Sequence, residues 1–95
     1  LEEEAIPLRP QVRAACELIG LDPLYLANEG KCLLMAPARE AEDLVKTLRC
    51  SKAGRDATVI GRVEEGPPGR VTLRTGVGGS RLLEALTGEP LPRIC

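Results

Sequence analysis

The chain has one aromatic side chain, Tyr25, among 95 residues, and this scarcity limits the core that it can build. Aromatic side chains supply the largest apolar areas in most protein cores. Leucine, valine, isoleucine and alanine must supply that area here. A folded chain of this length buries somewhat over ~60% of the surface that it exposes when unfolded. We therefore expect one domain, or part of one, with a thin core.

The charges are nearly balanced, with 13 basic and 14 acidic residues and a formal net charge of -1. Nucleic-acid binding requires a basic surface, often with stacking aromatics, and the sequence has neither. No apolar run approaches the ~20 residues of a membrane span, and the first residues do not resemble a signal peptide. We expect a cytoplasmic protein that binds neither nucleic acid nor membrane. Because the chain does not begin with methionine, we interpret it as a piece of a longer protein.

The four cysteines are Cys16, Cys32, Cys50 and Cys95. They include no Cys-x-x-Cys pair, and the chain has no histidine, so a zinc site is not expected. Cys16 lies on the apolar stripe of a predicted helix and Cys32 opens an apolar run, which favours burial of both. Cys50 follows a predicted helix and should be partly exposed. We expect free thiols.

Helical patterns occupy two parts of the chain. Residues 10–19 begin with a proline that suits a first turn, carry an apolar stripe and precede Gly20, a typical stop. Asp22 and Pro23 predict an N-cap and a short helical turn. Residues 38–49 repeat apolar side chains at helical spacing, with acidic residues early and basic ones late. Within them, Glu42 and Lys46 are spaced to form an ion pair.

The strand patterns predict a mixed α+β fold. Residues 31–36 and 57–64 are short apolar runs, and with the helix between them they predict a right-handed β-α-β unit. Residues 70–75 should pair back on 57–64 as a meander, with the helices on one face. Residues 80–87 suit either an amphipathic helix or an edge strand that returns through a hairpin.

The glycine-rich residues 75–79 are best explained as a hairpin turn. No Gly-Lys-Ser/Thr follows them, so a phosphate-binding loop is poorly supported. The acidic run at residues 2–4, together with Asp43 and Asp56, is typical of a solvated surface, and we assign these residues no role.

Asn28, Glu29 and Gly30 form a short polar turn before the apolar run 31–36. Such a turn most often has only a structural role. If the turn is held near a sheet end, however, Glu29 could be a partly desolvated carboxylate that acts as a general base.

The last residue, Cys95, places a thiol at the end of a segment that carries Pro90 and Pro92. An accessible thiolate is a nucleophile. The prolines favour an extended segment, and from Gly88 to Cys95 it could reach about 20 Å at the polyproline rise of ~3.1 Å per residue. Residues 89–95 are therefore predicted to be a flexible tail after a domain of residues 1–88. A frayed terminus is the alternative.

The motifs together resemble the C-terminal part of the HypE family of hydrogenase maturation proteins, within the PurM-like, AIR synthase-related superfamily. The stretches that carry the resemblance are residues 5–7, 20–30, 59–63, 75–79 and 91–95. The terminal Pro92, Arg93, Ile94 and Cys95 form the most specific motif. This resemblance implies that the chain is part of a PurM-like C-terminal domain.

In that family HypF carbamoylates the terminal cysteine, and ATP-dependent dehydration then converts the carbamoylated cysteine to a thiocyanate. The cyano group passes to iron on HypC–HypD. The resemblance implies that Cys95 is the carrier thiol and that Glu29 is an acid/base group. Pro92, Arg93 and Ile94 would be the tail residues that a partner recognises. ATP, magnesium and homodimer contacts belong to the family's N-terminal domain, so the isolated chain should be inactive as a dehydratase.

Two other functions remain open. The chain could be a carrier or docking module that displays Cys95 without chemistry of its own. It could also belong to a PurM-like metabolic kinase or synthetase, which would leave the terminal motif without a purpose.

Overall fold

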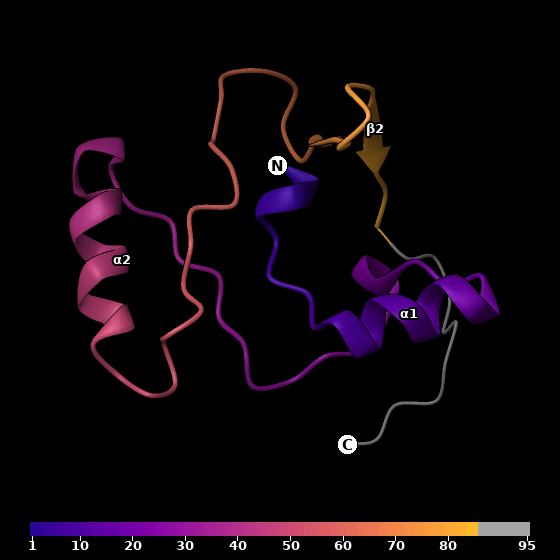
Figure 1. The fold of residues 1–95 in the computed structure, drawn as a ribbon. Helices are drawn as coiled ribbons and strands as arrows, with labels where there is room; N and C mark the ends of the chain where they lie inside the picture. The colour runs from indigo at the N-terminus through magenta and orange to yellow at the C-terminus, as the bar shows by residue number, and fades with distance from the viewer. Residues whose placement is uncertain (86–95) are drawn as a thin grey trace. The chain divides into compact units, whose positions relative to one another are not determined.

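The computed structural model describes residues 1–85 and shows the expected mixed α+β fold. The chain divides into two compact units. We call residues 1–7 and 35–84 the hairpin unit, and residues 8–34 the α1 unit. The elements, drawn in Figure 1, are three short 3-10 helices, two α-helices and two strands: η1 (Glu3–Ala5), α1 (Pro10–Ile19), η2 (Pro23–Tyr25), η3 (Ala38–Glu40), α2 (Ala41–Arg49), β1 (Val71–Arg74) and β2 (Ser80–Leu83).

Helix α1 has the bounds that the sequence predicts. Pro10 occupies its first turn, where a missing N–H costs no helical hydrogen bond. Gly20 ends it in the left-handed conformation, with φ 70°, and donates its N–H to the Cys16 carbonyl. Cys16 is buried as predicted, whereas Val12 and Ile19 on the predicted stripe are exposed.

Helix α2 and the 3-10 turn η3 together cover the helix predicted at residues 38–49. Acidic residues stand in the first turn of α2 and basic residues in the last, so both complement the helix dipole. Lys46 pairs with Asp43 at 3.8 Å rather than with Glu42, which the sequence favoured. Both side chains of this pair are exposed, so it adds little stability.

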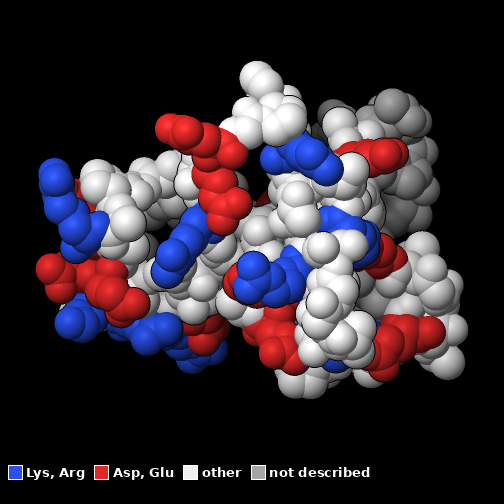
Figure 2. Space-filling model, turned by 90° about the horizontal axis from the view of Figure 1, so that it is seen from above, with Lys and Arg blue, Asp and Glu red and all other residues white. Residues whose placement is uncertain are grey.

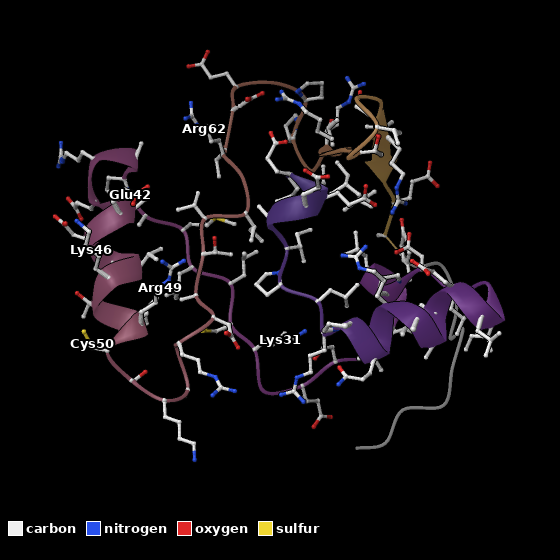
Figure 3. All side chains as sticks on the ribbon, viewed as in Figure 1. Lys31, Glu42, Lys46, Arg49, Cys50 and Arg62 are labelled. Atoms are coloured by element: carbon white, nitrogen blue, oxygen red, sulfur yellow. The ribbon has the colours of Figure 1, made fainter. Side chains whose placement is uncertain are left out.

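Backbone carbonyls around the end of α2 are bonded by side chains. Arg49 Nε donates to the Ala57 carbonyl at 2.8 Å, which ties the last turn of α2 to the chain that follows it. Ser51 Oγ donates to the Leu48 carbonyl at 2.9 Å and accepts from the Gly54 N–H at 3.0 Å. These contacts reverse the chain after the helix (Figure 3).

Strands β1 and β2 form an antiparallel hairpin, so the returning edge strand is the correct alternative for residues 80–83. Leu73 pairs with Arg81 across the hairpin, and Val71 pairs with Leu83. Leu73 is fully buried, and its face of the hairpin is therefore the inner one. The turn at residues 75–79 is the predicted hairpin turn.

The partner of β1 on its other side is the N-terminal backbone, which the sequence did not indicate. The Leu1 nitrogen donates to the Thr72 carbonyl at 2.7 Å, and the Arg74 N–H donates to the Leu1 carbonyl at 2.8 Å. Glu2 forms a parallel bridge with Arg74, and its N–H donates to the Ile60 carbonyl at 2.8 Å. Figure 1 shows the N-terminus beside this hairpin.

These contacts correct the predicted meander. Residues 70–75 do not pair back on residues 57–64, because the backbone of Leu1 and Glu2 lies between them. The predicted β-α-β unit is also absent from residues 1–85, since neither 31–36 nor 57–64 forms a strand there.

A strand requires neighbours for its N–H and C=O groups along its length. In residues 57–64 the N-terminal backbone bonds only to the Ile60 carbonyl, and no segment of the described chain forms a ladder with either run. Leu33 and Met35 are 67% and 80% exposed, so the expected buried strand has no apolar layer over it within the described part of the chain. Cys32 is exposed for the same reason, against the expectation that it is buried.

Acidic and basic side chains are interspersed over the face drawn in Figure 2, in keeping with the balanced composition. In the described part of the chain, no helix is long and apolar enough to cross a membrane.

The close approach of the backbone after α2 predicts that Gly54→Ala destabilises the protein. A Cβ at this position would overlap the Leu48 carbonyl oxygen, which is backbone and cannot turn aside. We expect the free energy of unfolding in urea to fall by about 1–3 kcal/mol. Gly66→Ala is the control, because a Cβ there meets nothing within 4 Å. Equal stability of the two variants would contradict this steric account.

Candidate functional site

The segment that carries Glu29 begins with a capped turn in the α1 unit. Asp22 Oδ1 accepts the Leu24 N–H at 2.9 Å, and Pro23 fills the first position of η2. The Leu26 N–H then donates to the Pro23 carbonyl at 3.4 Å. The predicted cap and turn are confirmed, and they fix the chain a few residues before Glu29.

Glu29 itself lies in an exposed loop. Gly30 follows it with φ 73°, a conformation that favours glycine and turns the chain after the carboxylate. The expected partial burial of Glu29 at a sheet end is wrong for the described residues, because Glu29 is exposed and residues 31–36 form no strand. The carboxylate is thus accessible to solvent and to an incoming group.

The predicted terminal site lies outside the described residues. Cys95 and the recognition residues Pro92, Arg93 and Ile94 all fall within 86–95, as does the predicted tail 89–95. Their roles remain predictions, and so does the acid/base role of Glu29.

The other three cysteines are free thiols, as expected. Cys16 is buried, and Cys32 and Cys50 are exposed. Cys50 Sγ donates to the Lys46 carbonyl at 3.3 Å at the end of α2, where Figure 3 labels both residues. Residues 1–85 contain no group of three or more His, Cys, Asp or Glu side chains that could hold a metal ion.

Several polar groups of the glycine-rich turn at residues 75–79 bond to one another within the turn. Thr75 N–H and Oγ1 both donate to the Gly79 carbonyl, at 2.8 and 3.1 Å, and the Gly78 N–H donates to the Thr75 carbonyl at 3.0 Å. Since several of these groups are already bonded, the turn is not a free cradle for phosphate. This agrees with the sequence-based interpretation.

Sequence reasoning missed the acidic run at the N-terminus, which contacts this hairpin. Glu3 Oε2 accepts the Gly76 N–H at 3.1 Å, and Glu2 Oε1 pairs with Arg74 Nη1 at 3.3 Å. No local pattern could have shown this, because the partners are more than seventy residues apart. A run of three glutamates that contacts only solvent would have the same sequence.

The family of the chain follows from comparison with known proteins. Residues 1–74 match the family described as AIR synthase related protein, C-terminal domain. The chain belongs to this family, and the match includes α1, α2 and β1.

Within the family, the chain is similar to proteins named carbamoyl dehydratase HypE. It is 52% identical to the one from Azotobacter vinelandii over 95 residues, which are 100% of this chain and 28% of that protein. The chain thus spans little more than a quarter of the length of this relative.

Solved structures of HypE are also similar to this chain. A crystal structure of hydrogenase maturation protein HypE in complex with ATP matches with a TM-score of 0.88 and 44% identity, over 100% of this chain and 30% of that one. A crystal structure of a HypE–HypF complex matches with a TM-score of 0.79 and 36% identity, over 87% of this chain and 27% of that one. The fold is therefore that of the corresponding part of HypE.

The left-handed backbone after Glu29 predicts a cost for Gly30→Ala. A Cβ at this position meets no atom within 4 Å, so the cost arises from backbone conformation alone. We expect the free energy of unfolding to fall by about 1–2 kcal/mol. Gly30→Asn should lose less, because asparagine tolerates this conformation. Chemical denaturation of both variants measures the difference, and an alanine variant as stable as the parent would contradict the assigned φ.

Proposed function

We propose that this chain is the C-terminal part of a carbamoyl dehydratase of hydrogenase maturation, and that Cys95 is the thiol that carries the one-carbon group. The similarity to proteins of that name carries the proposal, because it extends over all 95 residues and so includes Cys95. Residues 1–88 would be part of the folded domain, and residues 89–95 would be the segment that presents the thiol.

The proposed chemistry at Cys95 has two steps. The thiolate attacks the carbon of an activated carbamoyl group, a sulfur–carbon bond forms, the leaving group departs and the thiol proton passes to a base. Dehydration then converts S–C(=O)–NH2 to S–C≡N. The amide oxygen leaves as phosphate after phosphoryl transfer from ATP, and the two nitrogen protons are removed by base.

Glu29 is our candidate for a base in the second step. Its carboxylate is exposed on the loop between η2 and Gly30, so a carbamoylated sulfur and its amide nitrogen could approach it. A carboxylate is a suitable acceptor for protons released as the carbon–nitrogen triple bond forms. The alternative role is to position the incoming group by hydrogen bonding.

The described residues offer no evident site for ATP or magnesium. The glycine-rich turn bonds internally and to Glu3, and residues 1–85 contain no group of three or more His, Cys, Asp or Glu side chains that could hold a metal ion. We therefore assign no nucleotide or metal contact to this part of the chain. We propose that those contacts, and a homodimer interface, are formed by the portion of the relatives that the chain does not span.

The proposed partners follow from the same similarity. A HypE–HypF complex structure matches 87% of this chain, which supports HypF as the donor of the carbamoyl group. We propose HypC–HypD as the acceptor of the cyano group, and the cytoplasm as the compartment.

A carrier or docking module is the second candidate. It is favoured by one observation, that the described residues contain neither a metal-ligating cluster nor an open phosphate loop. In this description the chain accepts the carbamoyl group but performs no dehydration by itself. We accordingly propose that the chain alone is inactive as a dehydratase.

The acceptor role predicts a covalent adduct on Cys95. The chain is incubated with HypF, carbamoyl phosphate and ATP, and its intact mass is measured. We expect a carbamoyl adduct on the parent and none on Cys95→Ala. Cys50→Ala is the matched control, because Cys50 is an exposed thiol that the proposal does not use.

An adduct that persists in Cys95→Ala would refute the acceptor role of this residue. A parent chain that circular dichroism shows to be folded, and that gains no adduct, would contradict the proposed function itself. Subsequent loss of water from the isolated chain would favour the enzyme over the carrier module.

The base role predicts a selective defect in Glu29→Gln. In a protein of the complete length of the relatives, the rate of dehydration should fall by roughly 10²–10⁴-fold, whereas carbamoylation should proceed as in the parent. Mass spectrometry at timed intervals measures both steps. Glu17→Gln, an exposed glutamate on α1, is the control and should leave both rates unchanged. Unchanged dehydration in Glu29→Gln would remove this residue from the mechanism.

A further inference from the structure

The hairpin β1–β2 precedes the terminal segment and depends on few contacts. Among the described residues, β1 is the only strand that pairs with β2. A two-stranded hairpin is marginally stable in water without further support. Whatever fixes its turn therefore affects the place from which the chain continues toward Cys95.

The turn is bonded to the N-terminal run by a side chain. Glu3 Oε2 accepts the Gly76 N–H at 3.1 Å, and the internal bonds of the turn do not use this N–H. A hydrogen bond to a carboxylate is stronger than one between neutral groups. The turn thus has an external attachment at its second residue.

Glu3 is itself held in place by the backbone around it. It is half-buried and opens η1, and its predecessor Glu2 bridges to Arg74 and donates to the Ile60 carbonyl. The carboxylate therefore approaches Gly76 from a fixed backbone rather than from a frayed terminus. The conformational entropy lost when its hydrogen bond forms is therefore smaller than it would be for a glutamate in a frayed terminus.

Opening of the hairpin would lengthen the chain between the folded unit and the thiol. The proposed tail begins after residue 88, seven positions before Cys95, whereas Arg74, the last residue of β1, is twenty-one positions before it. The effective concentration of a tethered group falls as about the −3/2 power of linker length. A connection that begins at Arg74 would thus reduce it by about fivefold.

We infer that Glu3 is a positioning residue that holds the 75–79 turn, and through it the hairpin from which the carrier thiol is presented. The inference rests on the proposed function only in its second part, the presentation of Cys95. Its first part, the attachment of the turn, concerns the fold alone.

Amide hydrogen exchange tests the attachment in the protein of complete length. In Glu3→Ala the Gly76 N–H and the β2 amides should exchange roughly threefold to tenfold faster than in the parent. Glu3→Gln, which keeps an acceptor oxygen without the charge, should restore part of the protection. Glu42→Ala is the matched control, because it removes the same charge from an exposed side chain of the same unit, on α2.

Timed mass spectrometry tests the presentation in the same variants. Carbamoylation by HypF is an encounter between two proteins and should keep the parent rate in Glu3→Ala. Dehydration requires the thiol to reach a site in its own protein, and its rate should fall about fivefold. Glu3→Gln should recover most of this loss, and Glu42→Ala should equal the parent.

Unchanged exchange at Gly76 in Glu3→Ala would overturn the inference whatever the kinetics. Faster exchange with unchanged dehydration would overturn the link to Cys95, and an equal loss of both chemical steps would show general unfolding instead of positioning. Absence of carbamoylation on the parent would overturn the proposed function, while the exchange result would still decide the role of Glu3.

Discussion

The backbone of Leu1 and Glu2 is the interaction on which the hairpin unit depends. It bonds to Thr72 and Arg74 on one side and to Ile60 on the other, so residues at the two ends of the unit's sequence become neighbours. Without it, β1 would have only β2 as a partner in the described chain. The ion pair of Glu2 with Arg74 and the bond from Gly76 to Glu3 reinforce an arrangement that the main chain has already set.

The elements that depend on residues nearby in the sequence have the bounds that the sequence predicts. Helix α1 is bounded by Pro10 and Gly20, and η2 is capped by Asp22, because each of these residues acts on backbone groups within a few positions. The turn at residues 75–79 was predictable for the same reason. The choice of strand for residues 80–83 was not, since an apolar pattern alone does not identify β1 as a partner.

The predictions that were wrong concern segments whose partners are distant in the sequence. Residues 31–36 and 57–64 have the composition of strands, but a strand forms only where another segment satisfies its backbone. Glu3 has the composition of a solvated surface, yet it contacts a turn at the far end of the unit. For the site, the terminal thiol and Glu29 were selected by resemblance, and only the accessibility of Glu29 could be compared with the structure.

The contrast between the thiols has a practical consequence for chemistry on Cys95. Among residues 1–85, an alkylating reagent meets two exposed thiols, Cys32 and Cys50, whereas Cys16 is 4% exposed. Modification of Cys16 therefore reports that the packing around this side chain has opened, independently of any catalytic assay. The molecule thus contains its own indicator of whether a failed carrier reaction reflects lost chemistry or a lost fold.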